Sequence, residues 1–426
     1  MHIPDGYLSP STCAALAAAA TPFWAVAFNR LKRSLSTRMV PMISIIGAFS
    51  FVIMMFNVPL PGGTTGHAVG MGIASIVLGP WGSIIAITVA LILQALLFGD
   101  GGILAIGANC LNMAIIGSMV AYGTYRLLVG RSALTAVRRV VAGAIAGYVA
   151  INVSALAAAI EFGVQPMLFH DASGVPLYSF YPLSVAIPAM MIGHLTIAGL
   201  AEAIFTGGLI AFLQKVDVSL LRASAPDSGP AGATTTMTSP KLSPLVGAVL
   251  ALCLLTPLGL LAAGTAWGEW GGEALPTQQV TSYLGQLDPA KGTALASDLD
   301  LLAASTADTS AANDYRSAAA AVRAGKTADA ANLIRPHIEA LQSADLARFS
   351  QLVPLVAAAK PSSGLSQLSS LWRAPLGGYA PGFVASAQLG YILSALVGVT
   401  AVGFIVFVIG RIAARRDAAR RSTSST

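Results

Sequence analysis

The feature that most restricts the fold of this chain is a series of apolar runs, each long enough to cross a lipid bilayer. A membrane helix needs about 20 mostly apolar residues. Such runs lie near 12–29, 39–57, 82–99, 103–128, 140–160, 182–213, 243–266 and 385–410, and a shorter, glycine-rich run lies near 67–80. Only 10% of the residues are charged, whereas a soluble domain has roughly a quarter. We therefore predict an all-α polytopic membrane protein with nine spans, and a soluble enzyme is excluded.

The distribution of Lys and Arg predicts the orientation of these spans, because basic loops are retained on the cytoplasmic side. With the N-terminus outside, nine spans place the basic loops near 30–38, 126–139 and 215–241 and the basic end of the chain inside. The outer connections before residue 266 then contain no Lys or Arg, and their charged residues are all acidic: Asp5, Asp100, Glu161 and Asp171. We predict a multi-pass inner-membrane protein with an extracytoplasmic N-terminus and a cytoplasmic C-terminus. The net charge of +6 reflects these loops, so no nucleic-acid binding is predicted.

A polar stretch rich in Pro, Gly and Thr divides the chain into two membrane units. It lies within residues 217–241, which are predicted to be a cytoplasmic linker. The preceding residues, 1–216, are predicted to form a seven-helix domain. The following residues, 242–412, are predicted to form a two-helix hairpin whose outer segment, 267–384, is Ala-rich with helical periodicity. We expect that segment to be helical and extracytoplasmic, and residues 413–426 to form a basic cytoplasmic tail.

The first two residues have an unusual capacity to bind a transition metal. The terminus carries Asp5 and no nearby Lys or Arg, unlike a signal peptide, so we expect it to be retained and translocated. The amine of Met1, the deprotonated amide of His2 and the Nδ1 atom of His2 can close two fused chelate rings on one ion. A fourth nitrogen completes a square plane, which suits Ni(II) or Cu(II). His67, in an outer loop rich in Pro and Gly, is the best-placed candidate; the alternative is two unrelated polar residues at the membrane surface.

Five motifs in the first part of the chain resemble those of a known family. They are MHIPDGYLSP at 1–10, GH at 66–67, LGPW at 78–81, QALLFGDGG at 94–102 and GANCLNM at 107–113. The family is CbiM/NikM, the substrate-capture components of energy-coupling-factor (ECF) transporters for nickel and cobalt. The resemblance implies that Ni(II) or Co(II) is the transported ion, bound by Met1, His2 and His67, with no permanent cofactor. The hairpin, with APLGGYAPG at 374–382, resembles the family's small accessory subunit fused into the same chain.

Three polar residues are expected to support the metal site. Asp100, Asn109 and Asn112 fall at or near the outer ends of predicted spans. Histidines that bind a metal usually donate their second ring N–H to an oxygen acceptor, and these side chains supply such oxygens. For the asparagines, a hydrogen bond between packed helices is the alternative. The remaining histidines, His170, His194 and His337, are not expected to take part.

Another group of residues is expected to couple the domain to a partner. Glu202 is a carboxylate within a predicted span, nearer the cytoplasmic half, and ionisable residues inside membranes are candidates for function. We expect it at the interface with a transmembrane coupling subunit, with a proton or metal path as the alternative. Ala14 and Ala18 lie four residues apart on the first span, where small residues allow close helix contact. They are expected at the same interface, with internal packing as the alternative.

These features predict the substrate-binding subunit of an ATP-driven importer of nickel or cobalt, not an enzyme. The sequence Gly325-Lys326-Thr327 is no phosphate-binding loop, because position 320 is Ala instead of Gly. ATP hydrolysis is therefore expected in partners: a transmembrane coupling subunit and cytoplasmic ATP-binding-cassette ATPases. The alternative is a self-sufficient secondary transporter or channel, which normally shows paired intramembrane charges or broken helices in both halves of a repeat. The residues do not distinguish nickel from cobalt, although a square plane favours Ni(II).

Overall fold

Helices make up nearly all of the regular structure. The computed structural model describes residues 1–34, 39–56, 58–60, 64–171, 175–224, 243–261, 274–338, 341, 343–359 and 363–423. Most of the predicted linker, 217–241, and the last three residues of the predicted tail lie outside these ranges. The predicted all-α fold is confirmed, with one small addition. Two three-residue strands, β1 (Val58–Leu60) and β2 (Thr64–Gly66), pair antiparallel just before His67.

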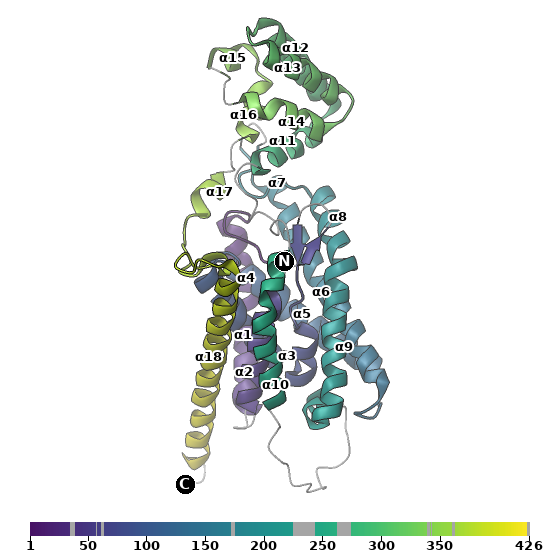
Figure 1. The fold of residues 1–426 in the computed structure, drawn as a ribbon, viewed down its shortest axis with the longest axis vertical. Helices are drawn as coiled ribbons and strands as arrows, with labels where there is room; N and C mark the ends of the chain where they lie inside the picture. Colours follow the sequence, from purple (N-terminus) through teal and green to yellow (C-terminus); the bar gives the residue numbers. More distant parts are fainter. Residues whose placement is uncertain are drawn as a thin grey trace.

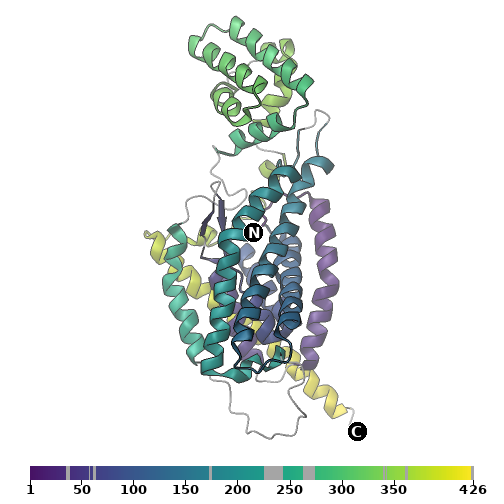
Figure 2. The same cartoon turned by 90° about the vertical axis from the view of Figure 1, so that its right-hand side faces the viewer.

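The long helices lie side by side in an elongated bundle (Figures 1 and 2). The bundle helices are α1 (Pro10–Ser34), α2 (Met39–Met54), α3 (Met71–Leu93), α4 (Ile106–Asn109), α5 (Gly117–Val129), α6 (Val137–Gly163), α7 (Gln165–Leu168), α8 (Leu183–Gly193), α9 (Gly199–Val216), α10 (Ser243–Leu255) and α18 (Ala387–Thr423). Short π-helical segments at Gln94–Phe98, Cys110–Ile116 and His194–Ala198 extend or join them. Helix α6 packs against α5, α8 and α9, whereas α18 packs against α2. The hairpin thus lies directly on the first membrane unit.

A helical subdomain stands on one end of the bundle, which we name the upper end as in Figure 1. It contains α11 (Ala274–Gln286), α12 (Pro289–Ser305), α13 (Thr309–Arg323), α14 (Thr327–Ile338), α15 (Ser343–Arg348) and α16 (Leu352–Ala358), and α17 (Ser363–Leu368) leads back to the bundle. Its Ala- and Leu-rich helices share a core that includes Leu299, Tyr315 and Ile334. The expected helical segment is therefore present as a small domain with its own core.

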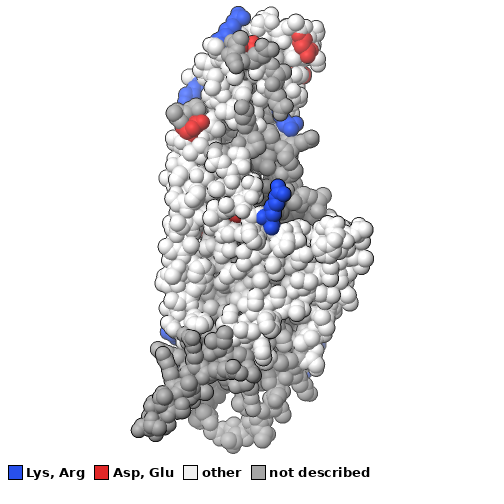
Figure 3. All heavy atoms as spheres, turned by 90° about the vertical axis from the view of Figure 1, so that its left-hand side faces the viewer, with Lys and Arg blue, Asp and Glu red and all other residues white. Residues whose placement is uncertain are grey.

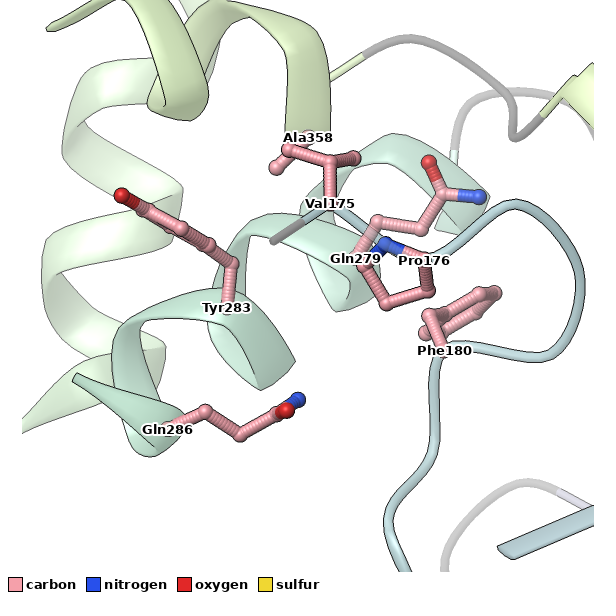
Figure 4. A pocket seen from close by; sticks show the side chains of 7 residues that line it. All are labelled: Val175, Pro176, Phe180, Gln279, Tyr283, Gln286 and Ala358. Carbon is pink, nitrogen blue, oxygen red and sulfur yellow. The ribbon is translucent and has the colours of Figure 1, made fainter. Parts of the chain in front are cut away.

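The subdomain touches the bundle at the loop that follows residue 175. The hydroxyl of Ser282 on α11 donates a hydrogen bond to the carbonyl of Phe180, at 2.6 Å. A small pocket lies at this junction (Figure 4). It is lined by Val175, Pro176 and Phe180 from the loop, by Gln279, Tyr283 and Gln286 from α11, and by Ala358 from α16.

The surface of the bundle is suited to lipid. In the described residues, seven helices are long and apolar enough to cross a membrane, and Val40–Met54 is a shorter apolar helix. Figure 3 shows a broad face of the bundle with almost no charged side chain, while Lys, Arg, Asp and Glu gather on the subdomain above it. Such a band matches the hydrocarbon core of a bilayer.

The third expected span, 67–80, differs from an ordinary membrane helix. Residues 67–70 are not helical, the helix begins at Met71, and it reverses at Gly79, whose φ is 71° and ψ is 166°. The hydroxyls of Ser75 and Ser83 are 3.3 Å apart, whereas eight residues of a straight helix would separate them by about 12 Å. The expected spans 67–80 and 82–99 are therefore the two arms of one sharply bent element.

The first part of this element, which we name the short arm, has eight helical residues, 71–78. It nevertheless reaches the lower end of the bundle. The guanidinium of Arg30, near the end of α1, lies 5.6 Å from the ring centre of Trp81, which follows the reversal. The eight helical residues of the short arm span about 12 Å, and they are preceded by the non-helical residues 67–70, of which Gly70 is left-handed with a φ of 76°. The segment from His67 to Gly79 is thus a broken span whose far end lies beside the end of α1.

The reversal predicts a specific need for glycine at position 79. Its dihedral angles lie in a region that only glycine adopts readily, and a Cβ atom there would meet no atom within 4 Å. Gly79→Ala is expected to destabilise the protein by about 1–3 kcal/mol through backbone strain alone. Gly123→Ala is the matched control, because that position is helical and equally open. Thermal unfolding in detergent should show a lower midpoint for Gly79→Ala only; equal midpoints for the two variants would contradict the assigned reversal.

Candidate metal site

The first nine residues form an irregular segment that enters the bundle instead of extending into solvent. Met1, His2 and Ile3 are 3%, 5% and 0% exposed. Helix α1 begins behind them at Pro10, where the hydroxyl of Ser9 caps the first turn by accepting from the amide of Thr12, at 3.0 Å. The N-terminus thus lies in the interior of the upper bundle.

Residues 102–109 hold this segment through hydrogen bonds to the backbone of Ile3 and the side chain of Asp5. The side-chain oxygen of Asn109 accepts from the amide of Ile3 at 2.8 Å, and its amide group donates to the carbonyl of Ile3 at 3.1 Å. The carboxylate of Asp5 accepts from the amides of Ile103 and Leu104, both at 2.9 Å. Gly102 lies so close that a Cβ atom there would be 2.3 Å from Asp5 Oδ1. These contacts fix the position of the two residues that precede Ile3.

Glu202 holds the other half of the site in place. Its carboxylate is fully buried and accepts from the amides of Val69 at 2.7 Å, Gly70 at 2.9 Å and Gly72 at 3.1 Å. These N–H groups stand at the start of the short arm of α3, where a helix has no internal acceptors for them. The carboxylate satisfies them and matches the positive end of the helix dipole.

Glu202 was expected at a coupling interface, and the structure places its side chain in the interior of the bundle, with 0% exposure. Its contacts instead set the position of the chain that immediately follows His67. The spacing of charged residues along the sequence gave no sign of this, because the partners are backbone groups more than 100 residues away.

The two histidines converge in the upper bundle. The Nδ1 atom of His2 lies 3.2 Å from the Nε2 atom of His67, and the rings stack with centres 5.0 Å apart. Neighbouring ligands of a square-planar ion, with metal–nitrogen bonds of about 2.0–2.1 Å, are roughly 2.9 Å apart. The arrangement is thus close to that of two adjacent ligands of one ion.

Both imidazoles are neutral in this environment, which is the form that binds a metal. Burial, followed by the positive N-terminal amine, lowers the pKa of His2 to about 3. Burial likewise lowers the pKa of His67 well below its ordinary value. The Nδ1 atom of His67 lies 3.1 Å from the carbonyl oxygen of Ala68. It therefore carries the ring proton, which leaves a lone pair on Nε2, toward His2.

Polar side chains from three parts of the chain surround His2. Asp100 Oδ1 lies 3.1 Å from His2 Nδ1, and Gln94 Oε1 lies 3.3 Å from His2 Nε2. The hydroxyl of Tyr379, from the C-terminal hairpin, lies 2.6 Å from Asp100 Oδ2 and 3.0 Å from Gln94 Nε2. Burial raises the pKa of Asp100 and, with the adjacent Asp100, raises that of Tyr379. Gln94 and Tyr379 were missed as site residues, although both lie in motifs that the sequence displays.

The other predicted residues have separate positions. Asn112 has another partner than the histidines: its side-chain amide donates to the carboxylate of Glu161 at 2.8 Å, a contact between two helical segments. Ala14 and Ala18 are exposed on α1, at the edge of the bundle. His194 is buried and bonded to the carbonyl of Met190, and His337 pairs with Asp314 in the subdomain. Among the described residues, no group of three or more His, Cys, Asp or Glu side chains that could hold a metal ion is found.

Comparisons with known proteins relate this chain to metal transport proteins. Residues 2–220 match the protein family CbiM, described as cobalt uptake substrate-specific transmembrane region. A fused nickel transport protein, NikMN of Rhodobacter capsulatus, is 46% identical over 99% of this chain and 100% of its own length. The cobalt transport protein CbiM of Geobacter sulfurreducens is 31% identical over 64% of this chain and 75% of its own. A crystal structure described as a transition metal transporter is 55% identical, with a TM-score of 0.48, over 51% of this chain and 94% of that one.

The role assigned to Glu202 gives a testable prediction. In Glu202→Gln, the NH2 that replaces one carboxylate oxygen cannot accept a hydrogen bond, so at least one of the three backbone N–H groups loses its acceptor. A hydrogen bond to a charged group contributes on the order of 2 kcal/mol, and the start of the short arm should open more often. Hydrogen exchange of the peptide that covers 67–78 should accelerate. Glu161→Gln is the control, since that carboxylate bonds Asn112; the same acceleration in both variants would contradict the assignment.

Proposed function

Because the chain belongs to the CbiM family of cobalt-uptake substrate-specific transmembrane regions, we propose that it is the metal-capturing subunit of an ATP-driven, ECF-type importer of nickel or cobalt ions. The chain is a nickel or cobalt transport membrane protein of the CbiM/NikM type. The observation that carries the finer proposal is the convergence of His2 Nδ1 and His67 Nε2 at 3.2 Å, beside a buried N-terminus.

The proposed ligands are four nitrogens. The amine of Met1, the deprotonated amide of His2 and the Nδ1 atom of His2 supply three of them within one dipeptide, and His67 Nε2 supplies the fourth. The burial of Met1 and His2 and the contact between His2 and His67 support this set. Four nitrogens in a plane favour Ni(II). We propose Ni(II) and Co(II) as substrates, since relatives of this chain are named for each metal.

Energy for uptake is proposed to come from partners. The sequence holds no complete phosphate-binding loop, so the partners are a transmembrane coupling subunit and cytoplasmic ATP-binding-cassette ATPases. The exposed face of α1 that carries Ala14 and Ala18 is the proposed contact with the coupling subunit. Small residues on such a face allow close approach of a second helix.

A second candidate function is a self-sufficient secondary transporter. The broken span from His67 to Gly79 favours it, because secondary transporters build their substrate sites around discontinuous helices. In such a transporter the metal would move down its own gradient or with a coupled ion, without ATPases. Transport assays separate the two functions.

The chelate predicts that the protein does not tolerate an addition before Met1. One extra residue removes the free amine from its chelating position, and the 3% exposure of Met1 leaves little room for it. Nickel binding is expected to weaken by at least about 100-fold, because even loss of groups that only support ligands costs 10–100-fold. Equilibrium dialysis with purified protein measures this, and intact mass verifies the terminal residue. The control carries the same addition after Thr426; unchanged binding by the N-terminally extended protein would exclude the chelate.

Reconstitution in vesicles tests the source of energy. Vesicles that hold the chain alone are expected to bind nickel without accumulating it. Vesicles that also hold the coupling subunit and the ATPases should accumulate nickel when ATP is present on the side of the membrane that the ATPases face. Radioactive nickel uptake gives the measurement. An ATPase variant that binds but does not hydrolyse ATP is the control. Concentrative uptake by the chain alone, driven by an ion gradient, would replace the proposed function with the second candidate.

A further inference from the structure

The loop between α17 and α18 exposes several large apolar side chains. We name it the rim loop, residues 369–386, and Figure 1 shows it beside the upper end of the bundle. Leu371, Trp372 and Phe383 are 53%, 47% and 74% exposed. The only charged residue of the rim loop is Arg373. Apolar side chains gathered in this way mark a surface that contacts a partner or a membrane.

The subdomain above the bundle has a more polar surface. Its described residues between 274 and 359 expose two large apolar side chains, Leu301 at 52% and Val353 at 45%, and Figure 3 shows charged side chains on it. The rim loop exposes three such side chains within a much shorter stretch. Its surface therefore resembles that of the membrane helices, where Leu200 and Ile204 of α9 are 56% and 70% exposed.

Two membrane spans end at the level of the rim loop. The span Met71–Phe98 ends beside it. The indole N–H of Trp372 donates to the carbonyl of Leu96 at 2.9 Å, and the amide of Leu376 donates to the carbonyl of Leu97 at 2.9 Å. Helix α18, whose first residues begin another span, follows the rim loop directly. A segment held between the ends of two spans lies at the border between hydrocarbon and headgroups.

The exposed residue types of the rim loop suit this border. Tryptophan is enriched where hydrocarbon meets headgroups, and Trp372 is bonded to the bundle while nearly half of its surface is exposed. A long basic side chain places its apolar stem along apolar surface and its charged head in the polar layer, which fits the exposed Arg373. The wholly apolar Phe383 fits the hydrocarbon side.

We propose that the rim loop is a membrane anchor: Leu371, Trp372 and Phe383 insert into the upper border of the lipid bilayer, and Arg373 contacts phospholipid phosphates. The partner is the bilayer instead of another protein, because the apolar patch continues the lipid-facing surface of the two spans beside it. The proposal is independent of the ligands proposed for the metal.

Anchoring of the rim loop bears on the metal site, because the loop carries Tyr379. This residue is 4% exposed, its ring stacks on Phe98 with centres 4.9 Å apart, and its hydroxyl lies 2.6 Å from Asp100 Oδ2. The rim loop thus has one side packed into the bundle and another side covered by lipid. The lipid contact restrains the segment that places Tyr379 beside Asp100.

Spin labels on introduced cysteines measure where the rim loop lies relative to the bilayer. The full-length, metal-free protein is placed in nanodiscs of phosphatidylcholine and phosphatidylglycerol. The native residues Cys13, Cys110 and Cys253 are buried, and wild type treated with the label shows any background. Phe383→Cys reports on the rim loop, and Leu301→Cys is the control on the subdomain. Electron paramagnetic resonance compares relaxation by oxygen, which concentrates in hydrocarbon, with relaxation by chromium oxalate, which stays in water.

The two labels are expected to differ in opposite directions. The label of Phe383→Cys should be relaxed mainly by oxygen, and that of Leu301→Cys mainly by chromium oxalate. Equal access of chromium oxalate to both labels would overturn the proposal, because the apolar patch would then face water and be open to a partner protein.

Hydrogen exchange in the same nanodiscs tests whether the lipid contact restrains the rim loop. The double variant Leu371→Ser/Phe383→Ser removes exposed apolar side chains and keeps Trp372. Burial of one large apolar side chain changes an equilibrium constant by roughly 10–100-fold, so amides of the rim loop are expected to exchange at least about 10-fold faster. Leu301→Ser/Val353→Ser is the matched control, and unchanged exchange of the bundle helices verifies that both variants are folded. Rim-loop exchange at the wild-type rate in Leu371→Ser/Phe383→Ser would refute the anchor.

Discussion

A buried backbone N–H group in an apolar bundle needs a hydrogen-bond acceptor. In this fold, one carboxylate is the acceptor for the N–H groups at the start of the broken span. Glu202 accepts from the amides of three residues at the start of the short arm of α3, Val69, Gly70 and Gly72. Without an acceptor, a helix that begins in the hydrocarbon region leaves several N–H groups unpaired, each at a cost of several kcal/mol. The broken span exists because Glu202 stabilises its start. The break in turn leaves His67 outside the helix, free to approach the N-terminus.

The same requirement explains why the N-terminal segment is so densely bonded. An irregular segment inside a bundle carries polar backbone groups that a helix would satisfy internally. Here the side chain of Asn109 bonds both backbone groups of Ile3, and the amide of Gly102 also donates to the carbonyl of Ile3. The two irregular segments therefore depend on side chains from elsewhere, and they meet at the one place where both His2 and His67 are presented. The site lies where two non-helical segments, residues 1–9 and 67–70, meet.

Hydropathy predicts most of this architecture, because membrane helices and loops differ strongly in apolar content. It identified the long spans and the helical segment 267–384, but it treated 67–80 as a uniform span. An apolar run looks the same whether its backbone is extended or helical, so only Gly79 and Pro80 hinted at the reversal. The chemistry of the first dipeptide indicated His2, and the outer loop rich in Pro and Gly indicated His67. Gln94 and Tyr379 were not predicted as site residues, since their contact joins positions 285 residues apart. The partners of Asn112 and Glu202 were not predicted for the same reason: they are distant in sequence.

The side chains of His2, Gln94, Tyr379 and Asp100 form a ring of polar contacts. The distance between these residues along the chain has a consequence for how the protein is made. His2 is synthesised first, Gln94 and Asp100 follow, and Tyr379 leaves the ribosome only after the linker and the whole helical subdomain. Domains generally fold in the order of their synthesis. The bundle can therefore assemble and bury the N-terminus well before the hydroxyl that closes the ring has been made. The ring closes only when the last membrane helix is in place, and a complete site marks a chain whose biogenesis is finished.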